Sequence, residues 1–120
     1  MNRHADNIRT RVETPWGIAD SRTSYAPGIV FYSTPSHGGF QLSAEKLAQL
    51  VAVHGQVETF CGLPHWFEED CDWAYVATSF PDIFTADELA QAQATLAWLK
   101  ARATAPALPA TSASALGGGQ

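Results

Sequence analysis

The fold of this chain is decided by residues 25–42, which read YAPGIVFYSTPSHGGFQL. Residues 29–33 combine β-branched and aromatic side chains, which predicts a strand, and the alternation over residues 40–42 predicts another. The segments 26–28 and 34–39 contain Pro and Gly and are typical of turns. A further short strand is expected over residues 14–20, so that three strands form an antiparallel meander.

Helices are predicted after the meander. Ser43 is a natural N-cap for a helix that begins at residue 44 and ends near Gly55. Thr85 and Glu88 match a capping box, which predicts that the last helix begins there. Between these two helices, apolar residues recur at spacings of three and four over residues 65–80, which favours a helix ended by Pro81. A strand over residues 73–80 is the alternative, and residues 56–64 are expected to form a loop.

The predicted fold class is therefore α+β, with a three-stranded antiparallel meander followed by about three helices packed on one face. A chain of 120 residues fits one domain. We expect a loose N-terminal lead-in over residues 1–13 and a single domain over residues 14–103. Residues 104–120 are rich in Ala, Pro, Ser and Gly and are expected to be disordered.

The net charge of −5 is distributed unevenly. Residues 47–99 carry eight acids and no Lys or Arg, whereas the rest of the chain carries seven basic residues and four acids, so −8 and +3 sum to −5. Direct binding to nucleic acid through the acidic half is disfavoured because phosphates repel carboxylates, whereas a basic protein partner is attracted. The alternative is that the acids only keep the domain soluble.

Composition also indicates the compartment. The two cysteines, Cys61 and Cys71, are too few for a disulfide framework. The N-terminus lacks the apolar stretch of a signal peptide, and no apolar run is long enough to span a bilayer. We expect a cytoplasmic protein with reduced thiols.

Two groups of residues could carry chemistry. His37 lies in a Gly-rich turn beside Ser36, and Asp70 lies in the acidic run 68–72, where a helix would place it between Trp66 and Trp73. His37 and Asp70 could form a small enzymatic or ligand-binding site, although neighbouring residues such as Ser36 and His37 rarely form a catalytic pair.

No metal site or cofactor is predicted. Cys61, His65, Cys71 and Asp72 are potential ligands, but the spacing C-x3-H-x5-C does not match the usual zinc patterns. Both cysteines are expected to be core or near-core thiols. The sequence also lacks a P-loop, a dinucleotide-binding glycine motif and a nucleophile elbow.

Several ordered blocks resemble a family of uncharacterised small domains found in proteins of bacterial plasmids, integrative elements and phages. The blocks are TPWG at 14–17, YAPGIVFYST at 25–34, SHGGF at 36–40, EEDCDWA at 68–74 and FP at 80–81. The resemblance covers about residues 14–99 and carries no known functional residues. It implies a mobile genetic element, a setting in which small acidic proteins often inhibit host defence.

These observations lead to one main hypothesis. The chain is expected to be a non-enzymatic inhibitor of anti-CRISPR or antirestriction type that docks on a basic nucleic-acid-binding surface, with no direct contact to nucleic acid or membrane. The predicted partner-binding residues are Glu68, Glu69, Asp72, Asp82, Asp87, Glu88 and His37. The alternatives are the small enzyme or ligand-binding module that uses His37 and Asp70, and an accessory structural domain.

Overall fold

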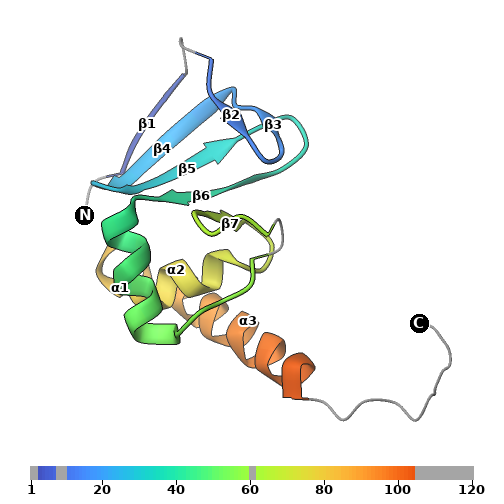
Figure 1. Cartoon of the computed structure of the whole chain (residues 1–120). Helices are drawn as coiled ribbons and strands as arrows, with labels where there is room; N and C mark the ends of the chain where they lie inside the picture. The colour runs from blue at the N-terminus through green and yellow to red at the C-terminus, as the bar shows by residue number, and fades with distance from the viewer. Residues whose placement is uncertain (1–2, 8–10, 60–61, 105–120) are drawn as a thin grey trace, which may run out of the picture.

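The computed structural model describes residues 3–7, 11–59 and 62–104. They form a five-stranded antiparallel sheet in the order β1-β4-β5-β6-β7, a separate two-stranded hairpin and three α-helices (Figure 1). The strands of the large sheet are β1 (His4–Asn7), β4 (Ser21–Ala26), β5 (Ile29–Ser33), β6 (Gly38–Leu42) and β7 (Trp66–Glu68). The hairpin is β2 (Glu13–Thr14) and β3 (Gly17–Ile18), and the helices are α1 (Ala44–His54), α2 (Trp73–Ser79) and α3 (Ala86–Thr104), with a 3-10 turn over Pro81–Ile83.

The α+β class is confirmed, but the predicted meander is only partly correct. Strands β5 and β6 form where the sequence predicted them and pair in register, with Phe31 opposite Phe40. The third strand of the meander is β4, a segment of mainly polar residues for which no strand was predicted. Residues 14–20 instead contribute to the β2–β3 hairpin, because Pro15 and Trp16 occupy its turn and Gly17 has a φ of 122°.

The expected loose lead-in over residues 1–13 is also corrected. Residues His4–Asn7 form β1, which pairs with β4 at the edge of the sheet, and Glu13 and Thr14 form β2. Polar side chains suit an edge strand, which explains why no apolar pattern marked β1. Of the predicted disordered tail, Thr104 is the last residue of α3, and positions 105–120 lie outside the described residues.

The single helix predicted over residues 65–80 is wrong in its first half. Residues Trp66–Glu68 form β7, which pairs with β6, and α2 begins only at Trp73. The carboxylates of Glu68 and Asp72 accept hydrogen bonds from backbone N–H groups of this segment, which gives the backbone an alternative to helical bonding. The alternative of a strand over residues 73–80 is wrong as well, because α2 occupies that region.

The other two helices form as predicted. The Ser43 hydroxyl accepts a hydrogen bond from the N–H of Lys46 at 3.2 Å, and Gly55 ends α1 with a φ of 78°. Thr85 and Glu88 form a reciprocal capping box at the start of α3. Helices α1 and α2 contact the sheet at β6, and α3 packs against α2 (Figure 1).

The main core lies between the sheet and the helices. Side chains that alternate along β5 and β6 point to the helices, and Phe67 of β7 joins them with no exposed surface. The fully or nearly fully buried members are Ile29, Phe40, Leu42, Leu50, Phe67, Val76 and Ile83. A second cluster joins α2 and α3 through Ala74, Ala77, Ala92 and Leu96. Small alanines allow these two helices to pack closely.

The opposite face of the sheet is covered by the hairpin. The Trp16 ring packs edge-on against Trp66 at 5.7 Å between centroids, and Trp66 also contacts Tyr32. A Cβ added at Gly39 would lie 2.6 Å from the carbonyl oxygen of Phe67 and closer still to the Trp16 ring. Gly39 is therefore the position on which the indole of Trp16 rests.

None of the helices within the described segments is long and apolar enough to cross a bilayer.

Candidate functional site

The eight acids of the region without Lys or Arg divide into three groups. Glu68 and Asp72 are buried, with 4% and 5% of their surface exposed. Glu88 is half-buried. Exposed carboxylates remain at Glu58, Glu69, Asp70, Asp82 and Asp87. Of the residues predicted to contact a partner, Glu69, Asp82, Asp87 and His37 are on the surface, whereas Glu68 and Asp72 do not fit that role.

Glu68 and Asp72 stabilise the connection from β7 to α2. One Glu68 oxygen accepts hydrogen bonds from the N–H groups of Asp70 and Cys71, and Asp72 accepts one from the N–H of Glu68. Burial, with a smaller contribution from the charge of Asp70, raises the pKa of the Glu68 carboxyl above its ordinary value. The same turn leaves Asp70 exposed rather than between two indoles, which corrects the placement expected on a helix.

Glu88 has two structural partners. Its Oε1 accepts a hydrogen bond from the N–H of Thr85 at 2.9 Å. Both of its oxygens accept hydrogen bonds from the Arg3 guanidinium, at 2.6 and 3.1 Å. The hydrogen bond from Arg3 is the main reason that the pKa of Glu88 lies below its ordinary value. Glu88 therefore holds the N-terminal segment against α3.

An aromatic groove of about 180 Å³ lies beside this ion pair. Its walls come from the sheet, from α2 and from α3, which are distant in sequence. The lining residues are Tyr25, Phe31, Phe40, Glu69, Trp73, Phe84, Glu88 and Gln91. Two of these eight residues are acids and five are aromatic, so the groove combines π-faces with negative charge.

Arg3 contacts residues of the groove wall from beside the groove. The Arg3 guanidinium lies over the Tyr25 ring at 4.0 Å from the centroid and near Phe84 at 5.5 Å. It also donates a hydrogen bond to the Ile83 carbonyl oxygen at 3.1 Å. Burial raises the pKa of the Tyr25 hydroxyl, although the charge of Arg3 opposes the shift. A cation stacked on rings and paired with a carboxylate is a favourable arrangement.

The structure brings His37 and Asp70 near each other, which meets only part of the enzyme or ligand-binding alternative, because that alternative also requires a concave pocket around them. Ligand atoms of His37, Glu68 and Asp70 lie within 4.8 Å of one another, and His37 Nδ1 is 3.9 Å from a Glu68 oxygen. Such a set can hold a divalent cation. However, Glu68 already accepts two backbone hydrogen bonds, and neither His37 nor Asp70 lines the aromatic groove.

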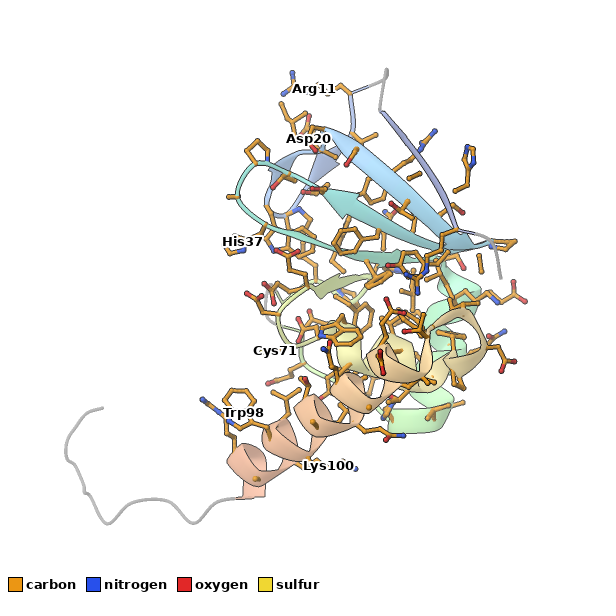
Figure 2. The ribbon with its side chains drawn as sticks, turned by 180° about the vertical axis from the view of Figure 1, so that it is seen from behind. Arg11, Asp20, His37, Cys71, Trp98 and Lys100 are labelled. Atoms are coloured by element: carbon orange, nitrogen blue, oxygen red, sulfur yellow. The ribbon has the colours of Figure 1, made fainter. Side chains whose placement is uncertain are left out.

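The turn around His37 has a structural explanation. The Thr34 hydroxyl accepts hydrogen bonds from the N–H groups of Ser36 and His37 and donates one to the His37 carbonyl oxygen. The Ser36 hydroxyl donates to the Trp16 carbonyl oxygen rather than to His37. Figure 2 shows the His37 ring at the edge of the molecule. The residues therefore form a turn and not a nucleophile–base pair.

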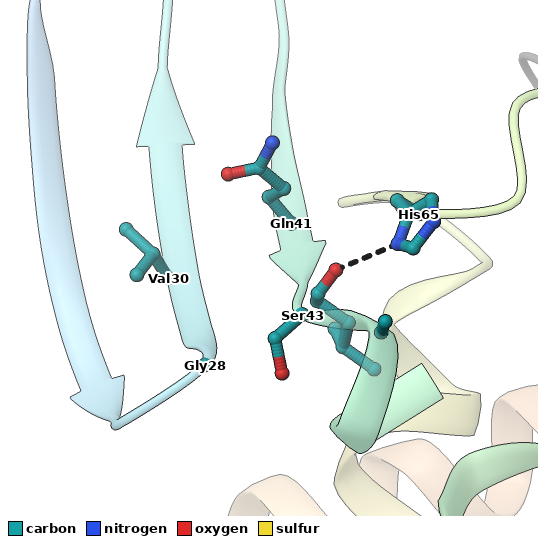
Figure 3. A pocket seen from close by; sticks show the side chains of 7 residues that line it. Gly28, Val30, Gln41, Ser43 and His65 are labelled. Atoms are coloured by element: carbon teal, nitrogen blue, oxygen red, sulfur yellow. Dashed lines mark hydrogen bonds between the residues drawn. The ribbon is translucent and has the colours of Figure 1, made fainter. Parts of the chain in front are cut away.

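A larger open hollow of about 430 Å³ lies where β5 and β6 meet the start of α1 (Figure 3). Gln41, Ser43 and His65 contribute its polar groups. Two of them have structural partners, because Ser43 caps α1 and His65 Nδ1 is 2.9 Å from the Leu42 carbonyl oxygen. The hollow has the size of a ligand site, about 300–1,000 Å³, but no group of charged side chains converges on it.

Among the described residues, His65, Cys71 and Asp72 do not form a group that could hold a metal ion. Cys61 lies outside the described residues. Cys71 is a free, half-buried thiol whose pKa is raised by burial and by neighbouring carboxylates, which makes it a poor nucleophile. It lines a third hollow of about 340 Å³ with Asp72, Trp98 and Arg102, and the Arg102 guanidinium stacks on Trp98.

Sequence reasoning missed the contribution of Arg3 and the groove beside it. Arg3 lies in the segment expected to be a loose lead-in, and the groove residues span positions 25–91. The aromatic content of the chain was the only signal, and it indicated buried area rather than a site.

Comparison with known proteins supplies the family but no activity. A family model described as a domain of unknown function, DUF7007, matches residues 9–107. No curated protein and no solved structure matches the chain. The comparisons therefore relate the chain to no enzyme. All residues that line the aromatic groove lie within the matched segment, whereas Arg3 precedes it. The chain belongs to the DUF7007 family of domains of unknown function.

Proposed function

We propose that the protein is a non-enzymatic binding protein that docks on a basic surface of a protein partner. The observation that carries the proposal is the placement of its exposed acids. Glu69 lines the aromatic groove, Asp82 is two residues from the groove residue Phe84, and Asp87 is next to Glu88. These three residues, here called the acidic rim, have no ion-pair partner in the described part of the chain.

The acidic rim favours a protein partner over a nucleic acid. Unpaired carboxylates repel phosphates and attract Lys and Arg side chains. Aromatic side chains are also enriched in protein interfaces, where Trp and Tyr are frequent among the residues that contribute most of the binding energy. Arg3 is a basic side chain that the structure places beside this surface, and it pairs with Glu88 rather than with a residue of the acidic rim.

The proposed partner is a host defence complex of CRISPR or restriction type, and the proposed setting is a mobile genetic element. The support is the resemblance noted above, together with the fact that such complexes hold nucleic acid on basic surfaces. An acidic protein can occupy such a surface and exclude the nucleic acid. The predicted inhibition is therefore competitive with nucleic acid and weakens as salt rises.

Charge reversal tests the proposal. The variant Glu69→Lys, Asp82→Lys, Asp87→Lys leaves the structural carboxylates Glu68, Asp72 and Glu88 in place. The control Glu13→Lys, Asp20→Lys, Glu45→Lys changes the net charge equally and also reverses one acid in the first turn of a helix. Thermal unfolding of each variant checks that the fold is retained.

The measurements are direct binding to purified CRISPR effector and restriction complexes, and protection of DNA from their cleavage. We expect the acidic-rim variant to bind at least tenfold more weakly and the control variant to bind like the wild type. If the wild type binds none of these complexes, or if both variants bind equally well, the proposed docking is wrong.

A further inference from the structure

The aromatic groove has the size of one side chain rather than of a whole small molecule. Its volume of about 180 Å³ lies below the range of about 300–1,000 Å³ that is usual for ligand pockets. It is open to solvent along α3, where Gln91 is exposed. The groove can therefore receive a side chain that projects from a partner protein.

A guanidinium lies beside one end of the groove and contacts two of its lining residues. Arg3 stacks on Tyr25 and pairs with both oxygens of Glu88. A planar guanidinium can stack on a ring and pair with a carboxylate at the same time, whereas an ammonium cannot form this two-pronged contact. The walls of the groove are thus suited to arginine in particular.

The other end of the groove repeats this chemistry without an occupant from the described residues. Trp73 provides an indole, the ring type that binds cations best, and Phe31 provides a second, half-buried ring, whereas Phe40 forms the buried floor. The Glu69 carboxylate lines the same space and forms no ion pair with another described residue. Burial of a cation here would give Glu69 the counter-charge that Glu88 receives from Arg3.

We infer that the Trp73 end of the groove binds one arginine side chain of the basic partner, stacked on the aromatic walls and paired with Glu69. The inference rests on the proposed function and names the contact that this function uses. Arg3 pairs with Glu88 beside the groove and carries a positive charge. Its repulsion limits the affinity for the incoming arginine, and its removal frees a second carboxylate.

The test uses a capped tripeptide, acetyl-Gly-Arg-Gly-amide, titrated into the full chain. The control peptide carries citrulline, which is a neutral analogue of arginine with almost the same shape. The readout is the indole N–H signal of Trp73 in a ¹⁵N NMR spectrum, with the signals of Trp16, Trp66 and Trp98 as internal references. We expect the arginine peptide to shift the Trp73 signal in a saturable manner and the citrulline peptide to leave it unchanged.

Two substitutions complete the test. Glu69→Gln keeps the size of the side chain and removes its charge, so the dissociation constant of the arginine peptide should rise at least fivefold. Glu58→Gln, at an exposed acid outside the groove, should leave it unchanged. Arg3→Ala should lower it. Equal binding of the two peptides, or an unchanged dissociation constant in Glu69→Gln, would overturn the inference.

The proposed function is judged by a separate variant, Asp82→Lys, Asp87→Lys, which does not alter Glu69. If this double reversal weakens binding to the defence complex while Glu69→Gln does not weaken binding of the arginine peptide, docking stands and the arginine site is wrong. If the peptide binds as expected but no defence complex binds the wild type, the arginine site stands and the partner class is wrong.

Discussion

Substitution of Gly39 by alanine should strongly destabilise the sheet. The new Cβ would lie 2.6 Å from the carbonyl oxygen of Phe67 and 2.8 Å from Cζ3 of Trp16, with Cη2 of Trp16 closer still. Ordinary contact begins at 3.4 Å, so the carbonyl would have to retreat by about 0.8 Å (3.4 − 2.6). Neither the paired strand β7 nor the indole can move without losing contacts.

The expected cost follows from these displacements. Overpacking of this kind costs about 1–3 kcal/mol. Displacement of Trp16 also removes its edge-on contact with Trp66, which is worth about 0.5–1.5 kcal/mol. We therefore expect Gly39→Ala to lower the free energy of unfolding by about 3 kcal/mol, which corresponds to a fall in Tm of about 12 °C or more.

Urea and thermal unfolding followed by circular dichroism measure this effect. The control is Gly55→Ala, where φ 78° and ψ −171° lie in a region almost confined to glycine but no atom lies within 4 Å of the added Cβ, so only the backbone cost of about 1–3 kcal/mol is expected. Trp16→Ala removes two of the three atoms that lie closest to the Cβ added at Gly39. The free-energy loss of the double variant should therefore be about 1 kcal/mol smaller than the sum of the two single losses. A Gly39→Ala loss of less than about 1 kcal/mol, or strict additivity with Trp16→Ala, would refute the reasoning.

Three further predictions concern ionisable groups. Arg3→Ala should lower the free energy of unfolding by about 1 kcal/mol, because it removes a partly exposed ion pair and a cation–π contact. An unchanged midpoint of chemical unfolding would contradict this. Because burial raises the pKa of Glu68, wild-type stability should fall as pH rises from about 4.3 through the raised value, and Glu68→Gln should remove that fall. Because Arg3 lowers the pKa of the Glu88 carboxyl, the stabilisation from their ion pair should be present at neutral pH and lost as pH falls through the lowered pKa. Glu88→Gln should abolish this loss of stability.

Local signals were sufficient for part of the fold. Strands β5 and β6 and helices α1 and α3 carry their own signals, namely β-branched runs, a Ser43 N-cap and the capping box that begins at Thr85. Strands β1 and β4 could not be predicted in this way, because their mainly polar residues become strands only by pairing with each other and with β5. Pairing is a property of distant segments, which local propensity does not report.

The region around Glu68 illustrates a different limit. The spacing of Trp66, Trp73 and their neighbours fits a helix, but two carboxylates that accept backbone N–H groups divide the segment into β7, a turn and α2. The same burial removes Glu68 and Asp72 from any docking surface, so a count of acids overstated the charge available to a partner. The aromatic groove could not be predicted from the sequence, because its walls come from the sheet, α2 and α3, which are distant along the chain.

The ion pair of Arg3 with Glu88 joins residues that are 85 positions apart, and this separation has a kinetic consequence. A contact that closes so long a loop forms late in folding, and an edge strand held by it is among the first parts to open. Amide hydrogen exchange should therefore divide the sheet into a fast edge at β1 and a slow centre at β5 and β6. Each opening of the fast edge uncovers the Glu88 end of the groove while the rest of the domain stays folded.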